Sequence, residues 1–423
     1  MKILFLLSTI YLTVNKCVYI KLRFNKYSNY KEGTNYFDYL EKNDIFIILE
    51  IGTPPQEIPI FFDFESYPFY ISNLFLNGTY NENRSSTFKY KGSKKESNFY
   101  GEIISQGYEV MDKIKLLDIK NKNIEINDFN YILPTKLNKN KDINFKTSII
   151  GLKIQESIYL QKNGFIHQLK QNNIIDSYSW TIKYINDNEG EIIIGGYPHE
   201  YDNNYDEKDF KNTKAEIRYS MISWDLLFDS IISKNIEMEN RHVELDINLG
   251  FVRGINSYQK FLDEQFFNLK KNCKKLNSTK YFYYTCDGKE KISDFPTLIL
   301  NHKELNYTFE LNYKDLFILK DNIYYCLIIF DNSNKMVNWR MGKPFFKKYQ
   351  LSFESDRKLI VFYIRKKRIN ILWIIIIFLI IVIIVLIILM IRKYLNMPRK
   401  IRANELNDDF EYLVQDKDKK TIN

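Results

Sequence analysis

Metal chemistry in proteins relies mainly on cysteine and histidine, and this 423-residue chain has four residues of each type. The cysteines are Cys17, Cys273, Cys286 and Cys326, and the histidines are His167, His199, His242 and His302. No histidine lies near a cysteine pair at the spacing of a zinc site, so we expect no metal and no cofactor. If the first cysteine is removed with a signal peptide, three remain, which allows one disulfide and one free thiol in an oxidising compartment.

A series of short motifs runs between about residues 44 and 364. In chain order these are residues 51–56 (Ile-Gly-Thr-Pro-Pro-Gln), an apolar run ending at Phe62 and Asp63, residues 85–88 (Ser-Ser-Thr-Phe), residues 149–152 (Ile-Ile-Gly-Leu), residues 190–196 (Gly-Glu-Ile-Ile-Ile-Gly-Gly), Ser223 with Trp224, Leu245 with Asp246, and Met341 with Gly342, Phe345 and Tyr349. In this order the motifs resemble those of the pepsin-like aspartic proteases. The chain is rich in Ile, Lys, Asn and Tyr, as expected when an AT-rich genome biases the codons. This composition and the membrane-tethered form described below suggest the plasmepsin branch of that family.

The resemblance implies two β lobes with a cleft between them, each lobe contributing one catalytic aspartate. Asp63 and Asp246 match those two positions. Peptide hydrolysis by this class needs two carboxylates so close that they share one proton, because two like charges at that separation cannot both ionise. One carboxylate then acts as a base on a bound water, and the other acts as an acid toward the carbonyl oxygen.

The residues after each aspartate depart from the family motif of Thr, Gly and then Ser or Thr. Phe64, Glu65 and Ser66 follow the first aspartate, and Ile247 and Asn248 follow the second. In the family the two threonine hydroxyls bond across the lobe junction, so Phe64 and Ile247 predict that this brace is absent on both sides. Glu65 adds a third carboxylate. If it points inward it raises the aspartate pKa values or displaces the water, and if it points outward it only fits tightly.

Other site residues are also implied by the resemblance. Tyr100 and Gly101 match the flap that closes over a substrate, and Ser66 matches the residue that hydrogen-bonds the first aspartate. Cys286 and Cys326 match the disulfide of the second lobe, which leaves Cys273 as the odd thiol.

Each lobe of the family also has an apolar-apolar-Gly element, in which a Cβ at the glycine would collide with a strand passing close by. Gly151 and Gly342 match these glycines. Arg340 stands where the second element normally has an apolar residue, and Tyr70 stands where the family prefers tryptophan.

The elements that hold these residues are predicted to be mainly β. Short β-branched and aromatic runs at 45–51, 58–64, 191–194 and 359–363 are broken by Asn, Asp, Gly and Lys. Helical periodicity is brief and occurs at 164–171 and 259–270. The pattern predicts an all-β architecture, and the resemblance implies a bilobal pepsin-like fold with an N-terminal lobe at 44–210 and a C-terminal lobe at 211–364.

Composition narrows the class of protein further. With 45% hydrophobic and 16% aromatic residues the chain is too apolar to be disordered, and 15 glycines and 9 prolines are too few for a collagen-like or proline-rich protein. The formal charge of +9 comes from 61 basic and 52 acidic residues that interleave along most of the chain. This pattern is typical of a solvated surface, so no nucleic-acid partner is expected.

Two apolar segments predict the location of the protein. Residues 1–19 have the layout of a secretory signal peptide, with an uncleaved signal anchor as the alternative. Residues 371–391 carry no charge and are long enough for one transmembrane helix. We expect a single-pass type I membrane protein of the secretory pathway or cell surface. Its short pro-like segment (20–43) and lobes would be lumenal or extracellular, and its tail (392–423) would be cytoplasmic.

The sequence leaves two functions open. The first is a membrane-anchored acid endopeptidase that cleaves peptides with Asp63, Asp246 and an activated water. The second is a pseudoprotease, impaired by the lost Thr and Gly residues, whose cleft binds a peptide or protein partner without cutting it.

Overall fold

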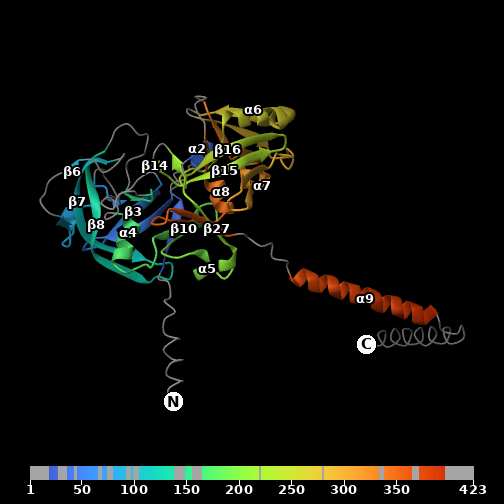
Figure 1. Ribbon diagram of the computed structural model, residues 1–423, viewed down its shortest axis with the longest axis horizontal. Coiled ribbons are helices and arrows are strands. Elements are labelled where there is room, and N and C mark those ends of the chain that lie inside the picture. Colours follow the sequence, from blue (N-terminus) through green and yellow to red (C-terminus); the bar gives the residue numbers. More distant parts are fainter. Residues whose placement is uncertain are drawn as a thin grey trace, which may run out of the picture. The chain divides into compact units, whose positions relative to one another are not determined.

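The computed structural model describes residues 19–26, 36–41, 45–64, 69–73, 80–91, 97–98, 104–137, 148–154, 164–218, 221–278, 281–332, 338–363 and 371–395. The chain divides into two compact units, one ending at Ile364 and the other beginning at Arg365. The first unit holds all the motifs named above. Figure 1 shows its β-sheets, with β7 and β8 in one part and β15 and β16 in another.

Among the described residues, fourteen strands form the first sheet. In spatial order they are β12 (Phe210–Lys214), β27 (Leu359–Tyr363), β26 (Ser352–Glu354), β10 (Ser179–Tyr184), β11 (Glu189–Ile194), β1 (Ile20–Lys26), β2 (Ile45–Ile51), β3 (Gln56–Asp63), β9 (Ser148–Gly151), β4 (Phe69–Tyr70), β8 (Asn123–Leu137), β7 (Ile104–Leu117) and β5 (Lys89–Tyr90), with β6 (Ser97–Asn98) paired to β7. Buried residues alternate along β1 and β2, as expected for strands that turn one face to the core.

Eleven strands of the described chain form the second sheet. In spatial order they are β21 (Tyr307–Leu311), β20 (Leu298–His302), β15 (Asp225–Ser233), β16 (Ile236–Leu245), β25 (Trp339–Met341), β17 (Val252–Arg253), β24 (Ile328–Asp331), β19 (Tyr281–Asp287), β23 (Ile323–Cys326) and β22 (Phe317–Lys320), with β18 (Cys273–Asn277) paired to β19. A small separate sheet joins β13 (Ile217–Arg218) to β14 (Met221–Ile222). The prediction of a mainly β protein is confirmed, and the two large sheets are consistent with the predicted two lobes.

The first sheet draws strands from distant parts of the chain. β1 lies between β11 and β2, and β26 and β27 join the same sheet beside β10. The expected lobe boundary at residue 210 therefore falls at the first residue of β12, which is itself a strand of this sheet. β1 lies in the predicted pro-like segment (20–43), and it is one of the central strands of this sheet.

The helices of the described chain are short, apart from the last one. They are α2 (Tyr36–Glu41), α4 (Phe165–Gln171), α5 (Pro198–Tyr201), α6 (Asn256–Gln265), α7 (Tyr313–Leu316), α8 (Lys343–Lys348) and α9 (Ile371–Leu395), with 3-10 turns η1 (Glu82–Arg84), η2 (Glu207–Asp209) and η3 (Phe267–Leu269). The helix predicted at 164–171 matches α4. The one predicted at 259–270 begins three residues earlier, as α6, and ends in η3.

The signal peptide predicted at 1–19 lies outside the described residues, apart from Tyr19. In α9 the side chains of residues 378–393 are described, and they are exposed. Taking only the residues that the structure describes, we find no helix long and apolar enough to cross a membrane.

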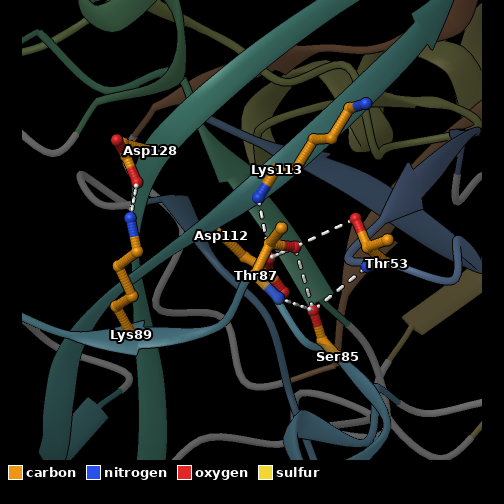
Figure 2. Close-up of polar contacts among 7 residues, drawn as sticks. All are labelled: Thr53, Ser85, Thr87, Lys89, Asp112, Lys113 and Asp128. Atoms are coloured by element: carbon orange, nitrogen blue, oxygen red, sulfur yellow. Dashed lines mark hydrogen bonds and ion pairs between the residues drawn. The ribbon is translucent and has the colours of Figure 1, made fainter.

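Two of the sequence motifs meet at a buried carboxylate in the first sheet (Figure 2). Asp112 of β7 is fully buried and accepts hydrogen bonds from Thr87 Oγ1 (2.5 Å) and Tyr80 OH (2.6 Å). Ser85 Oγ accepts a hydrogen bond from the backbone N–H of Thr53 at 3.1 Å. Gly52 has a φ of +85°, and a Cβ there would lie 2.7 Å from Ser85 Oγ. These contacts explain why this turn needs glycine and hydroxyl-bearing partners.

Candidate active site

Each aspartate lies at the end of a strand in the same local arrangement, Asp63 as the last residue of β3 and Asp246 directly after β16. In the first sheet β3 runs parallel to β9, with Asp63 opposite Gly151, and β4 runs antiparallel to β9. In the second sheet β16 runs parallel to β25, and β17 runs antiparallel to β25. Asp246 follows the last residue of β16, and its N–H donates to the carbonyl of Met341 at 3.0 Å. The two aspartates therefore occupy equivalent backbone positions in the two sheets.

Gly342 ends the second apolar-apolar-Gly element and has no room for a side chain. A Cβ at this position would lie 2.1 Å from the carbonyl oxygen of Leu249 and 2.3 Å from that of Phe251. Contacts this short with backbone atoms cannot be relieved by rotating a side chain. The collision expected from the sequence is confirmed here, and it fixes the loop after Asp246 against the end of β25.

One side chain links the loop of Asp246 to the strand of Asp63. Asn248 Nδ2 donates to the carbonyl of Phe62 at 2.8 Å, and the Asn248 N–H donates to Asp246 Oδ1 at 2.9 Å. The threonine hydroxyls of the family are missing on both sides, but a different side chain supplies a hydrogen bond between the loop of Asp246 and the strand of Asp63. An amide two residues after Asp246 can donate a hydrogen bond where the family uses a hydroxyl one residue after the aspartate.

The residues that replace the two threonines lie in the hydrophobic core. Ile247 is fully buried, and Phe64 is 7% exposed. The ring of Phe64 lies 5.0 Å from that of Trp180, 5.3 Å from Phe353 and 6.1 Å from Phe346, all in edge-to-face geometry. Edge-to-face aromatic contacts of this kind are favourable. Next to Asp63, the buried ring of Phe64 therefore occupies the position where the family has a threonine hydroxyl.

Arg340 dominates the electrostatics around the second aspartate. Its Nη1 lies 3.2 Å from Asp246 Oδ2, and its Nη2 lies 2.5 Å from Glu244 Oε2. The exposed fractions of the three side chains are 23% for Arg340, 23% for Asp246 and 14% for Glu244, so solvent screens the pairs only in part. The sequence marked Arg340 only as unusual, because its partners follow from the pairing of β16 with β25.

Tyr70 places a neutral phenol near the first aspartate. Burial raises the pKa of Tyr70 far above its ordinary value, and the charge of Asp63 raises it further. Within the described residues the Tyr70 hydroxyl is buried and makes no hydrogen bond. Tyr70 therefore remains protonated at every pH relevant to peptide hydrolysis.

Four predicted site residues lie outside the described residues, namely Glu65, Ser66, Tyr100 and Gly101. The direction of the Glu65 carboxylate and the flap at Tyr100 therefore stay predictions. Among the described residues, no group of three His, Cys, Asp or Glu side chains is placed to hold a metal ion.

The disulfide predicted between Cys286 and Cys326 is wrong, because the structure joins Cys273 to Cys286. Cys273 and Cys286 stand directly opposite each other on the antiparallel strands β18 and β19. On its other side Cys286 faces Tyr324, which is two positions before Cys326 on β23. Cys326 is a buried free thiol, and burial raises its pKa to about 12. It is therefore a core residue and not a nucleophile.

The segment before β2 covers an aromatic patch next to the loop of Asp246. Phe37 of α2 is fully buried, and its ring stacks on Tyr283 at 3.7 Å and on Phe251 at 4.7 Å. Leu249, three residues after Asp246, packs against the same cluster. Sequence reasoning missed this contact, because a single aromatic residue in a short helix gives no signal of where it docks.

A hollow lies beside the end of β9, lined in part by Leu152, Phe165, Tyr178 and Asp356. The Leu152 N–H donates to the carbonyl of Asp63 at 2.7 Å, so the hollow adjoins the strand end of the first aspartate. Its described lining includes no residue of the Asp246 loop.

One aspartate thus stands at the end of each of two equivalent strands, and Asn248 links the loop of Asp246 to the strand of Asp63. A comparison with curated proteins gives no significant match. The sequence model of the eukaryotic aspartyl protease family matches residues 45–363, which is most of the chain, and the protein therefore belongs to that family.

Proposed function

We propose that this chain is a pepsin-like protein that binds a peptide beside Asp63 and Asp246 and hydrolyses it slowly or not at all. The observation that carries the proposal is the ion pair between Arg340 and Asp246. Asp246 accepts from Arg340 at Oδ2 and from the Asn248 N–H at Oδ1, so both carboxylate oxygens already have donors. The water that two-carboxylate chemistry needs would have to compete with both of these donors for the oxygens of Asp246.

An active acid endopeptidase is the second candidate, and two observations favour it. Asp63 and Asp246 end equivalent strands, and Asn248 supplies a cross-link between their loops. In that case one aspartate would activate water and the other would protonate the carbonyl oxygen. Peptide or protein substrates follow from membership of the family.

The experiment measures binding and cleavage together, using the full chain in detergent. Peptides with bulky apolar residues on both sides of the scissile bond are incubated with the native protein and with Asp63→Ala and Asp246→Ala between pH 3 and 7. We expect peptide binding by the native protein with no turnover. Cleavage by the native protein that disappears in both aspartate variants would establish the endopeptidase instead.

We also propose that the chain is a type I membrane protein anchored near its C-terminus, like the membrane-tethered, plasmepsin-like members of the family. The support is the uncharged run at 371–391, together with the apolar side chains of residues 378–391, which are exposed in α9. Protease treatment of intact vesicles is expected to degrade the tail at 392–423 and to spare residues 44–364. The opposite protection pattern would exclude this topology.

A further inference from the structure

The face of the second sheet beside Asp246 carries a row of charged residues. Glu244 of β16 is the direct partner of Arg340 on β25, and Arg340 is the direct partner of Arg253 on β17. Residues that pair directly across two strands project to the same side of a sheet. Two guanidinium groups therefore lie on one face, where they are compensated by the carboxylates of Glu244, Asp246 and Asp331.

The two arginines are held differently. Arg253 pairs with Asp331 at 2.9 Å and lies 5.0 Å from the ring centre of Tyr281, so these two residues hold its guanidinium. Arg340 divides its two terminal nitrogens between Glu244 and Asp246. The contact with Asp246 is the longer one, at 3.2 Å against 2.5 Å, and it is the one that a competing carboxylate can replace without breaking the pair with Glu244.

We propose that Arg340 selects peptides with an acidic side chain next to the bond that faces Asp246. The carboxylate of the bound peptide takes the place of Asp246 on the guanidinium, and Asp246 Oδ2 is released from the ion pair and can contact the water that hydrolysis requires. This inference rests on the proposed peptide binding and gives it a substrate class. A basic side chain at this position of the peptide would be repelled by the guanidinium groups of Arg253 and Arg340. An apolar side chain would leave the ion pair between Arg340 and Asp246 in place.

The exchange conserves charge pairing at the guanidinium. Arg340 keeps Glu244 and replaces one carboxylate by another, so no buried cation is left without a partner. A neutral amide such as glutamine can accept a hydrogen bond but brings no negative charge, and it competes poorly with Asp246. The structure thus predicts discrimination between glutamate and glutamine, two side chains of nearly equal size.

The test uses synthetic peptides with a Leu-Phe core and either Glu, Gln or Lys directly before or after it. Binding to the full chain in detergent is measured by fluorescence anisotropy, and turnover is measured by mass spectrometry. We expect one Glu peptide to bind about tenfold more tightly than its Gln counterpart, as is typical of a charged hydrogen bond. Any turnover is expected to be faster for that Glu peptide.

Three variants make the assignment specific. Arg340→Leu is expected to bring the Glu and Gln peptides to within about twofold of each other, because the selecting charge is gone. Arg340→Lys keeps the charge but cannot bridge two carboxylates, so an intermediate preference is expected. Arg357→Gln, which removes an arginine paired with Glu354 on the first sheet, is the matched control and should keep the tenfold preference.

The outcomes separate this inference from the proposed function. Equal binding of Glu and Gln peptides by the native chain overturns the inference and leaves peptide binding intact. A preference that survives in Arg340→Leu, or tighter binding of the Lys peptides, also overturns it. If none of the peptides binds, the proposed function fails and the inference fails with it.

Discussion

Asn248 shows how a single side chain can replace a motif residue from a different position. Its amide reaches the carbonyl of Phe62 in the strand that leads to Asp63, a contact that spans 186 residues of sequence. Phe64 and Ile247, which stand in the threonine positions, point into packed cores instead. The junction is therefore held by one amide on one side and by aromatic packing on the other.

Replacing Asn248 by alanine is expected to destabilise the protein by about 1 to 2 kcal/mol, since the partly buried carbonyl of Phe62 loses its donor. Urea unfolding of the full chain measures the change. Asn332→Ala is the matched control, because Asn332 Nδ2 also donates to a backbone carbonyl, that of Ser278, but at an exposed site. An equal loss of stability in both variants would show that the brace to Phe62 has no special role.

The two candidate aspartates could be proposed from the sequence, but the residues that form ion pairs and hydrogen bonds around them could not. Asp63 and Asp246 follow apolar runs in recognisable motifs, which is local information. The ion pair of Arg340 with Asp246 depends on the parallel register of β16 and β25, and the link from Asn248 depends on how two distant loops meet. Neither register nor loop contact is encoded in a short window of sequence.

At the scale of elements, short apolar runs rich in β-branched and aromatic residues were predicted closely. The runs at 45–51 and 359–363 coincide with β2 and β27, since such runs bounded by polar turn residues are typical of strands. The disulfide was predicted wrongly because the partner of Cys286 depends on which strand lies on each side of β19.

The end of β26 carries a buried acid whose protonation is linked to stability. Glu354 is 4% exposed and accepts hydrogen bonds from Arg357 and Tyr197. Burial by itself raises the pKa of Glu354, but these hydrogen bonds together outweigh it and leave the pKa below its usual value. The folded state therefore binds the proton more weakly than the unfolded state does.

The sign of the pH effect follows from this lowered pKa. The contribution of Glu354 to stability is fully present above the ordinary glutamate pKa of about 4.3 and is lost as the pH falls through the lower folded-state value. We expect Glu354→Gln to flatten the dependence of the free energy of unfolding on pH between about pH 5 and 3. Urea unfolding at several pH values checks this, with the exposed Glu239→Gln as control. Parallel curves for the native protein and Glu354→Gln would contradict the linkage.

At the scale of the whole unit, α2 binds a part of the chain that follows it by more than 200 residues. Phe37 closes an aromatic cluster with Phe251 and Tyr283, and Tyr36 contacts Tyr325 at 5.0 Å between ring centres. The predicted pro-like segment thus contributes both a strand to the first sheet and a helix to the surface of the second. Removing it would expose a patch of aromatic rings beside the loop of Asp246.

Phe37→Ala is expected to lower the free energy of unfolding by about 3 to 5 kcal/mol, the usual loss for a fully buried phenylalanine. Phe37→Leu keeps most of the apolar volume, so its loss should be clearly smaller. Thermal and urea unfolding measure both variants. A Phe37→Ala protein as stable as the native one would mean that α2 contributes nothing to the folded state.

The place of β1 also has a consequence for how the protein is made. β1 begins at Ile20, and the sheet that holds it also includes β27, which ends at Tyr363. The ribosome therefore completes β1 long before it has synthesised β27. At about 5 to 20 residues per second, the early strands wait roughly 20 to 70 seconds for β26 and β27. β10 ends at Tyr184 and β26 begins at Ser352, so the edge of β10 that β26 later covers stays open for roughly 8 to 34 seconds of that interval and is then accessible to a chaperone.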